Sequence, residues 1–224
     1  DKAQALTYKI GQGDALYDQG YYKADNAAIT AALFVYHDAL TLAPRENDPT
    51  GWSEVRDRMG QAQQVLGDRL TDPSMLETSL LSYRAALDVR TKAAMPVEWA
   101  NTQNNLGNIL YTIGMRQRDT AMLDEAVAAM QAALTVFTPE DMPAKWSVTL
   151  GNLTAVRVDL AALTYAATDN AEMAAAAAGV ADPTNIPEVV KARADANAIL
   201  EVALTTLHSA LDAKGSSLNP LDRA

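Results

Sequence analysis

The chain has 224 residues, 49% of them hydrophobic, with no cysteine and a formal charge of −10. This length and apolar content suit one large domain or two small ones, and they exclude intrinsic disorder. Without cysteine there is no disulfide framework, thiolate metal site or cysteine nucleophile. The negative charge opposes binding to nucleic acid, and no apolar run approaches the roughly 20 residues of a membrane span.

The sequence repeats itself with a period of about 47 residues. Trp52, Trp99 and Trp146 superimpose at this shift, each three residues after a proline. Two glycine positions and one leucine position follow the same period: Gly13, Gly60 and Gly107; Gly20, Gly67 and Gly114; Leu40, Leu87 and Leu134. So many coincidences at one offset indicate a repeat protein, in which the tryptophans are expected to pack between successive units.

Each unit is predicted to be a helical hairpin. In the third unit the first helix starts at Pro96, because a proline suits the first turn, and ends before Gly114, which is expected to be left-handed. A loop over 115–121 then leads to a second helix over 123–134, whose apolar residues follow the i, i+3, i+4, i+7 spacing.

In chain order, the sequence predicts one domain over 1–224 with four hairpins, an insert near 168–190 and a tail over 215–224. The hairpins span approximately 2–48, 49–95, 96–142 and 143–214. The second-helix pattern recurs over 29–40, 76–87, 123–134 and 200–211, and the last displacement is 77 residues instead of 47. An alanine run in the insert is expected to form a helical turn or two, which Gly179, Pro183 and Pro187 break into loop.

Small and bulky residues alternate in the second helices in a fixed order. The triplets are Ala32–Tyr36–Ala39, Ser79–Tyr83–Ala86, Ala126–Met130–Ala133 and Ala203–Leu207–Ala210. This pattern, with Leu106–Gly107 in a first helix, resembles the tetratricopeptide repeat, and the long period resembles bacterial variants with a P-x-x-W-A signature. The resemblance implies a right-handed α-solenoid whose first helices line a concave face; armadillo and HEAT repeats fit less well.

Catalytic, metal and cofactor sites are not expected. His37 and His208 occupy one repeat position, which Arg84 and Gln131 fill in the other units, so this position is predicted to face solvent. Gly11 and Gly13 lie inside a predicted helix and do not form a phosphate loop. We therefore expect a protein that is not an enzyme.

Amide side chains mark the candidate partner-binding site. The third unit carries Asn101, Asn104, Asn105 and Asn108 on its first helix, where asparagine is a poor helix former. In the repeat alignment Arg58 and Asn152 match Asn105, and Gln61 matches Asn108. A carboxamide offers both a donor and an acceptor to a peptide backbone, which the resemblance also implies for the concave face. The alternative is a polar surface that is merely solvated.

The function expected from these features is a scaffold or adaptor that binds a peptide or partner protein, favouring a basic partner. Two alternatives stay open: a self-associating structural module, through its terminal hairpins or the insert, and a ligand-sensing regulatory domain. Because the sequence begins at Asp1, we expect either that a leader or upstream region was removed or that the chain was cut at this point. The sequence leaves both the bacterial cytoplasm and the periplasm open.

Overall fold

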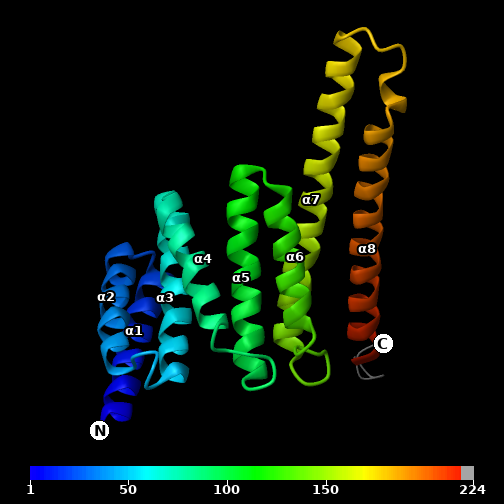
Figure 1. Cartoon of the computed structure of the whole chain (residues 1–224). Helices are drawn as coiled ribbons and strands as arrows, with labels where there is room; N and C mark the ends of the chain where they lie inside the picture. The colour runs from blue at the N-terminus through cyan, green and yellow to red at the C-terminus, as the bar shows by residue number, and fades with distance from the viewer. Residues whose placement is uncertain (218–224) are drawn as a thin grey trace. The chain divides into compact units, whose positions relative to one another are not determined.

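The computed structural model describes residues 1–217, with side chains for residues 1–210. This part of the chain contains eight α-helices and one short 3₁₀ helix and has no strand, which confirms the predicted all-α class (Figure 1). The helices are α1 (Lys2–Lys23), α2 (Asn26–Leu42), α3 (Pro49–Leu70), α4 (Pro73–Leu87), α5 (Pro96–Gln117), α6 (Thr120–Leu134), α7 (Pro143–Ala177) and α8 (Pro187–Ser217).

The chain divides into two compact units, Asp1–Ile109 and Leu110–Ala224, and the boundary falls within α5. The predicted repeat boundaries and the right-handed sense of the solenoid stay predictions, and residues 218–224 of the predicted tail lie outside the described part of the chain.

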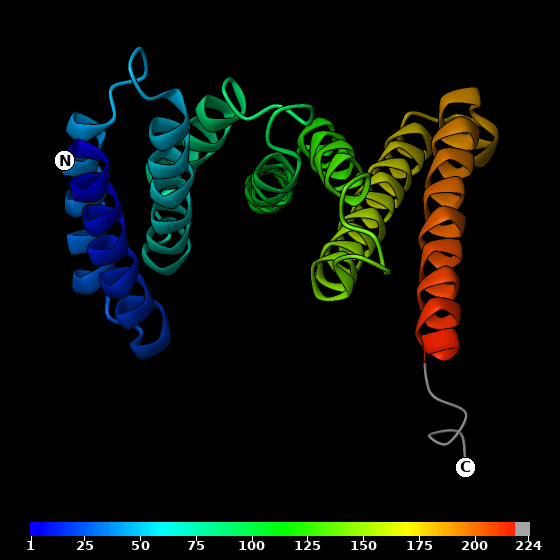
Figure 2. The same cartoon turned by 90° about the horizontal axis from the view of Figure 1, so that it is seen from below.

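Two hairpins build the first unit. α1 pairs with α2, α3 pairs with α4, and α3 also packs on α2, as Figure 2 shows from below. The core between α1, α2 and α3 is apolar. Its buried residues are Leu6, Ile10, Ile29, Ala32, Tyr36, Ala39, Ala43, Val55, Met59, Ala62 and Leu66. Packing of each hairpin on the next is the arrangement expected of a helical repeat.

The periodic glycines permit close helix packing instead of ending helices, so the predicted left-handed Gly114 is wrong. Gly114 lies inside α5, and the left-handed residue is Arg118, with φ 55°. A Cβ on Gly114 would lie 2.9 Å from Leu123 Cδ2, and one on Gly20 would lie 2.6 Å from Ile29 Cγ1. The glycines are therefore needed where the two helices of a hairpin converge.

The hairpin turns are shorter than predicted. α5 ends at Gln117 and α6 begins at Thr120, so only residues 118–119 connect them where a loop over 115–121 was expected. The Asp119 carboxylate accepts hydrogen bonds from the backbone N–H groups of Ala121 and Met122. An aspartate N-cap satisfies donors that the first turn leaves unpaired, so the next helix starts at once.

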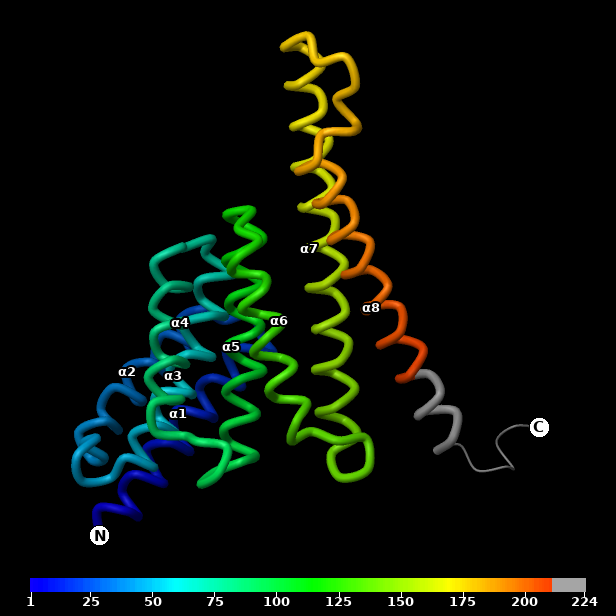
Figure 3. Tube along the Cα trace, turned by 45° about the vertical axis from the view of Figure 1, so that its right-hand side comes forward, coloured from blue at the N-terminus to red at the C-terminus, as the bar shows by residue number. Residues whose placement is uncertain are grey.

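The second unit contains α6, α7 and α8, and its last two helices form an extended hairpin (Figure 3). The predicted insert lengthens these helices, because residues 168–177 continue α7 and α8 already starts at Pro187. The alanine run therefore belongs to a long helix instead of an isolated turn or two. Gly179 adopts φ 82° and Pro183 opens the 3₁₀ helix (Pro183–Asn185), so these residues do end α7 and form the connection.

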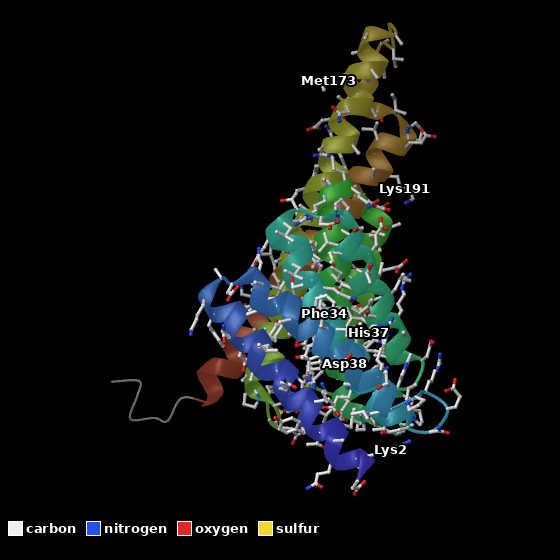
Figure 4. All side chains as sticks on the ribbon, turned by 90° about the vertical axis from the view of Figure 1, so that its left-hand side faces the viewer. Lys2, Phe34, His37, Asp38, Met173 and Lys191 are labelled. Carbon is white, nitrogen blue, oxygen red and sulfur yellow. The ribbon has the colours of Figure 1, made fainter. Side chains whose placement is uncertain are left out.

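The tryptophans and histidines differ in their surroundings. All three tryptophans are half-buried; the Arg45 guanidinium carbon lies 4.9 Å from the centre of the Trp52 ring, and Lys92 Nζ lies 5.9 Å from that of Trp99. Both histidines are exposed as predicted, and Figure 4 shows His37 on the outer side of α2 beside Phe34.

Within the described residues, no helix combines the length and hydropathy that crossing a bilayer demands.

Candidate binding site: a polar groove on the first unit

A groove of about 690 Å³ opens on the first unit between α3, the connection from α4 to α5, and the start of α5. Most of its lining is polar. The lining residues are Thr50, Ser53, Glu54, Asp57, Arg58, Gln61, Arg90, Met95, Glu98, Asn101, Asn104 and Asn105. The six residues from α3 follow the i, i+3, i+4, i+7 spacing, which places them on one face of that helix.

A buried ion pair forms the floor of the groove. Arg90 Nη1 lies 3.5 Å from Asp57 Oδ1 and donates a hydrogen bond of 2.7 Å to the Thr102 hydroxyl. That hydroxyl lies 2.9 Å from Asp57 Oδ1, to which it donates, and Gln61 Nε2 donates to Asp57 Oδ2 at 2.9 Å. Both carboxylate oxygens are therefore paired, as a buried charge requires.

A second charged cluster lies at the α1 side of α3. The Arg58 guanidinium lies 3.4 Å from Asp14 Oδ1 and 3.8 Å from Glu54 Oε1. The Tyr36 hydroxyl donates a hydrogen bond of 2.7 Å to the same Asp14 oxygen. Burial, followed by this hydrogen bond, raises the pKa of Tyr36 well above its ordinary value. These contacts fix Arg58 at the edge of the groove.

Three asparagines from the start of α5 form the opposite wall. Asn101, Asn104 and Asn105 all line the groove, so the structure brings together three of the predicted amides. Asn104 Oδ1 is buried, and within the described part of the chain it has no hydrogen-bond partner. An unpaired buried acceptor is unfavourable by about 1–3 kcal/mol.

The predicted site residues divide into those in the groove and those outside it. Arg58 and Gln61 line it together with the three asparagines, whereas Asn108 lies further along α5 and is absent from the lining. Asn152 lies on α7 in the second unit. Five of the seven predicted residues thus line one groove.

Sequence reasoning missed Asp57, Arg90 and Thr102, although the repeat carried a signal for Arg90. Its counterparts in the repeat alignment are Ala43 and Phe137, and all three positions are buried. A charged residue at a position that is apolar in neighbouring units needs a buried partner of opposite charge. Searching for such a partner on the adjacent first helix would have found Asp57.

The charges of the lining are nearly balanced. Glu54, Asp57 and Glu98 contribute three carboxylates, while Arg58 and Arg90 contribute two guanidinium groups, which leaves a net charge of −1. Among residues 1–210, no group of histidine, aspartate and glutamate side chains is arranged to hold a metal ion. The groove's chemistry is therefore that of amides, hydroxyls and paired charges.

A smaller hollow of about 380 Å³ lies on the second unit between α7 and α8. Trp146 and Leu150 line it from α7, and Val202 lines it from α8 together with three hydroxyl residues: Thr205, Thr206 and Ser209. It has no charged lining residue, so it offers less to orient a ligand than the polar groove does.

The chain is an all-α helical-repeat protein by its described helices. No protein-family model matches it, and no curated protein matches it either. Solved structures with some likeness include the de novo designed helical repeat protein DHR64, at a TM-score of 0.40 and 14% identity over 93% of this chain and 98% of that one. The DHF58 filament has a TM-score of 0.37 and 13% identity, with coverage of 93% and 98%.

A third solved structure is BtubC (BKLC) from P. vanneervenii, with a TM-score of 0.33 and 13% identity. The match covers 98% of this chain and 94% of that one. Likeness at these values is a general one between helical proteins, and no functional conclusion follows from it.

Proposed function

We propose that this protein is a non-enzymatic interaction scaffold of the long-period tetratricopeptide type, which binds an extended segment of a partner protein in the polar groove. The observation that carries the proposal is the buried, unpaired Asn104 Oδ1 in a groove that Asn101 and Asn105 also line. An N–H group of a partner's backbone would supply the donor that this oxygen lacks.

An extended peptide suits the groove better than a compact polar molecule. A peptide backbone presents alternating N–H and C=O groups, and the carboxamide is a side chain that can serve one of each. The groove's volume of about 690 Å³ falls within the usual range of volumes of ligand-binding pockets. Thr50 and Ser53 line the same space from α3, and the Ser53 hydroxyl donates a hydrogen bond to the Thr50 carbonyl.

The partner segment is proposed to be basic. The lining carries a net charge of −1 and the whole chain carries −10, so a cationic segment is attracted over a range of about one Debye length. This attraction mainly raises the association rate. Affinity would come from the amide contacts, which are closer and less screened by salt.

The hydrogen bonding of Asp57 supports binding instead of catalysis. Both oxygens of Asp57 are already engaged by Arg90, Thr102 and Gln61. A general base needs a lone pair directed at the substrate. The oxygens of Asp57 instead accept hydrogen bonds from the protein groups that form the floor of the groove.

The test is a selection of random peptides displayed on phage against the full chain, with affinities of the selected peptides measured by calorimetry. The variant Asn104→Ala/Asn105→Ala should lower affinity about tenfold, since each lost hydrogen bond contributes about 1 kcal/mol or somewhat less. Asn170→Ala, an exposed asparagine on α7, is the matched control and should bind like the wild type.

Hydrogen exchange should show that bound peptide protects the backbone of α3 and the start of α5. Selected sequences should be enriched in lysine and arginine, and their association should slow as salt rises. Equal affinity of the groove variant and the wild type, or protection confined to the second unit, would overturn the proposed site.

A further inference from the structure

The last helix of the described chain exposes leucines at positions that are covered in the other hairpins. Leu207 has an exposed fraction of 42%, whereas its repeat counterparts Tyr36, Tyr83 and Met130 have 1%, 1% and 0%. Leu204 is 56% exposed, and its counterpart Leu80 is 7% exposed. One face of α8 is therefore apolar without being buried, and Leu200, Leu204 and Leu207 define it as the α8 face.

The first unit shows what covers the equivalent face of α2. There the first helix of the next hairpin, α3, packs on α2, and its Val55, Met59 and Leu66 join Tyr36 in one buried cluster. Within residues 1–217, α8 is the last helix. The α8 face therefore has the apolar character that another amphipathic helix needs in order to pack on it.

The α1 helix of a second copy is a poor occupant for this face. The positions of α1 that correspond to Val55, Met59, Ala62 and Leu66 are Tyr8, Gln12, Ala15 and Gln19, all of them exposed. Burying two glutamine side chains against leucine without partners is unfavourable. Head-to-tail stacking of copies is disfavoured for this reason.

The α8 face itself is self-complementary. Leu200, Leu204 and Leu207 follow the four-then-three spacing of a coiled-coil seam, so the same face on a second copy can interdigitate with it. In an antiparallel pair, Leu204 of one copy meets Leu207 of the other. The same register brings Glu201 beside His208 of the second copy, and both side chains are exposed and available for this contact.

We infer that this chain forms a two-fold dimer through antiparallel pairing of the α8 faces of two copies. Antiparallel pairing also sets the two helix dipoles in opposite directions, which is favourable. A parallel pair would place Glu201 beside alanine instead. This interface lies on the second unit and is independent of the proposed peptide site.

Sedimentation over a concentration series tests the dimer with the full chain. The apparent mass should rise from 23.9 kDa towards twice that value and stop there, because a two-fold interface closes. Leu204→Glu/Leu207→Glu should weaken association by about 100-fold or more, since four leucine side chains per dimer lose their burial. Phe34→Glu/Leu81→Glu, which changes exposed residues of α2 and α4, should dimerise like the wild type.

A wild-type chain that stays monomeric throughout, or one that grows beyond two copies, would overturn the inference. So would equal loss of association in the Phe34→Glu/Leu81→Glu control. Circular dichroism of the variants separates a loss of association from a loss of helix. Association with an added helical protein but not with itself would also overturn the second copy as occupant.

Cross-linking tests the orientation separately, and the chain has no native cysteine to interfere. Chains carrying Leu204→Cys are mixed with isotopically labelled chains carrying Leu207→Cys and oxidised. Antiparallel pairing should give mainly the mixed disulfide between one chain of each kind. Disulfides mainly between identical chains would overturn the antiparallel arrangement.

Discussion

Arg90 and Asp57 form an ion pair at 3.5 Å in which the two side chains are only 7% and 8% exposed. The pair joins the connection that precedes α5 to the middle of α3, at a level where the neighbouring repeats have apolar contacts. Buried charges lose hydration, so the pair persists only because Thr102 and Gln61 complete its hydrogen bonds. The first unit therefore has a polar contact at a repeat position that the apolar Ala43 occupies in the preceding repeat.

Breaking this pair should destabilise the protein strongly. Asp57→Ala leaves the Arg90 guanidinium buried without its carboxylate, and we expect the free energy of unfolding to fall by about 3–5 kcal/mol. Urea denaturation followed by circular dichroism measures the change. Ile10 and Phe137 occupy the positions equivalent to Asp57 and Arg90 in other repeats. The double variant Asp57→Ile/Arg90→Phe introduces these apolar residues and should recover much of the loss.

The control for this prediction is the exposed pair of Arg45 and Asp88, which are 3.4 Å apart but lie at the surface. Arg45→Ala should change the unfolding free energy by at most about 1 kcal/mol. Equal losses for Asp57→Ala and Arg45→Ala would contradict the importance of burial.

Two neighbouring glycines of α1 should respond in opposite directions to alanine. A Cβ on Gly13 would lie 2.3 Å from Cε1 of the buried Tyr36 ring, so Gly13→Ala should destabilise the protein by about 1–3 kcal/mol. Gly11 has open space around its Cα, so Gly11→Ala should stabilise the helix by about 0.5–1 kcal/mol. Thermal denaturation of the two single variants measures both signs, and a gain in stability from Gly13→Ala would contradict the packing role.

Alkaline pH should weaken the link between α5 and α7 within the second unit. The Tyr111 hydroxyl donates to Asp159 Oδ2, and this hydrogen bond, followed by burial, raises the pKa of Tyr111 from 10.0 to about 12. The folded state therefore holds this proton more tightly than the unfolded state does. The resulting stability is present below pH 10 and is lost as pH rises through about 12.

Urea denaturation of the wild type and Tyr111→Phe at several pH values tests this effect. The stability difference between the two proteins should shrink between pH 10 and pH 12. Asp159→Asn, which removes the acceptor charge, should move the ultraviolet titration of Tyr111 to lower pH. A difference that stays constant over this range would show that the tyrosine proton does not contribute.

The aspartate at the start of α2 should stabilise that helix. Asp25 accepts hydrogen bonds from the backbone N–H groups of Ala27 and Ala28, at 2.9 and 3.1 Å. Asp25→Ala should lower the unfolding free energy by about 1 kcal/mol, because these first-turn donors lose their acceptor. Asp38→Ala, which removes a carboxylate from the exposed Lys9 pair, should have a smaller effect. The ranking is read from denaturant midpoints, and a larger loss from Asp38→Ala would contradict it.

Periodicity predicted the hairpins because packed positions recur with the structure. Tyr36 and Tyr83 recur at one repeat position, and Gly13 and Gly60 recur at another. In the structure each tyrosine ring is buried against the glycine of its own hairpin, which confirms that these positions are packed. Helix ends were harder to predict. Ala24, Thr71 and Arg118 adopt φ near 55° without being glycine, because the N-cap that follows one residue later fixes the turn.

The sequence predicted the asparagine wall of the candidate groove and, through the repeat alignment, Arg58 and Gln61 of the opposite wall. Several asparagines within one predicted helix stand out in a sequence because asparagine is a poor helix former. This feature identified Asn101, Asn104 and Asn105 as candidate binding residues. The opposite wall uses residues such as Glu54 and Asp57, which look like ordinary solvated charges until the groove is seen. No local pattern distinguishes a buried aspartate from an exposed one, since its partner Arg90 is 33 positions away.

The long hairpin of α7 and α8 ends in a connection over residues 178–186 whose side chains are largely open to solvent. Because the chain lacks thiols of its own, a cysteine at Asp182 would be a unique attachment point for a dye, a biotin or a solid support. Immobilised through this tip, the protein would carry the tether in the connection between α7 and α8, which contains no residue of the polar groove or of the α8 face. The two surfaces could then be assayed separately on the same preparation.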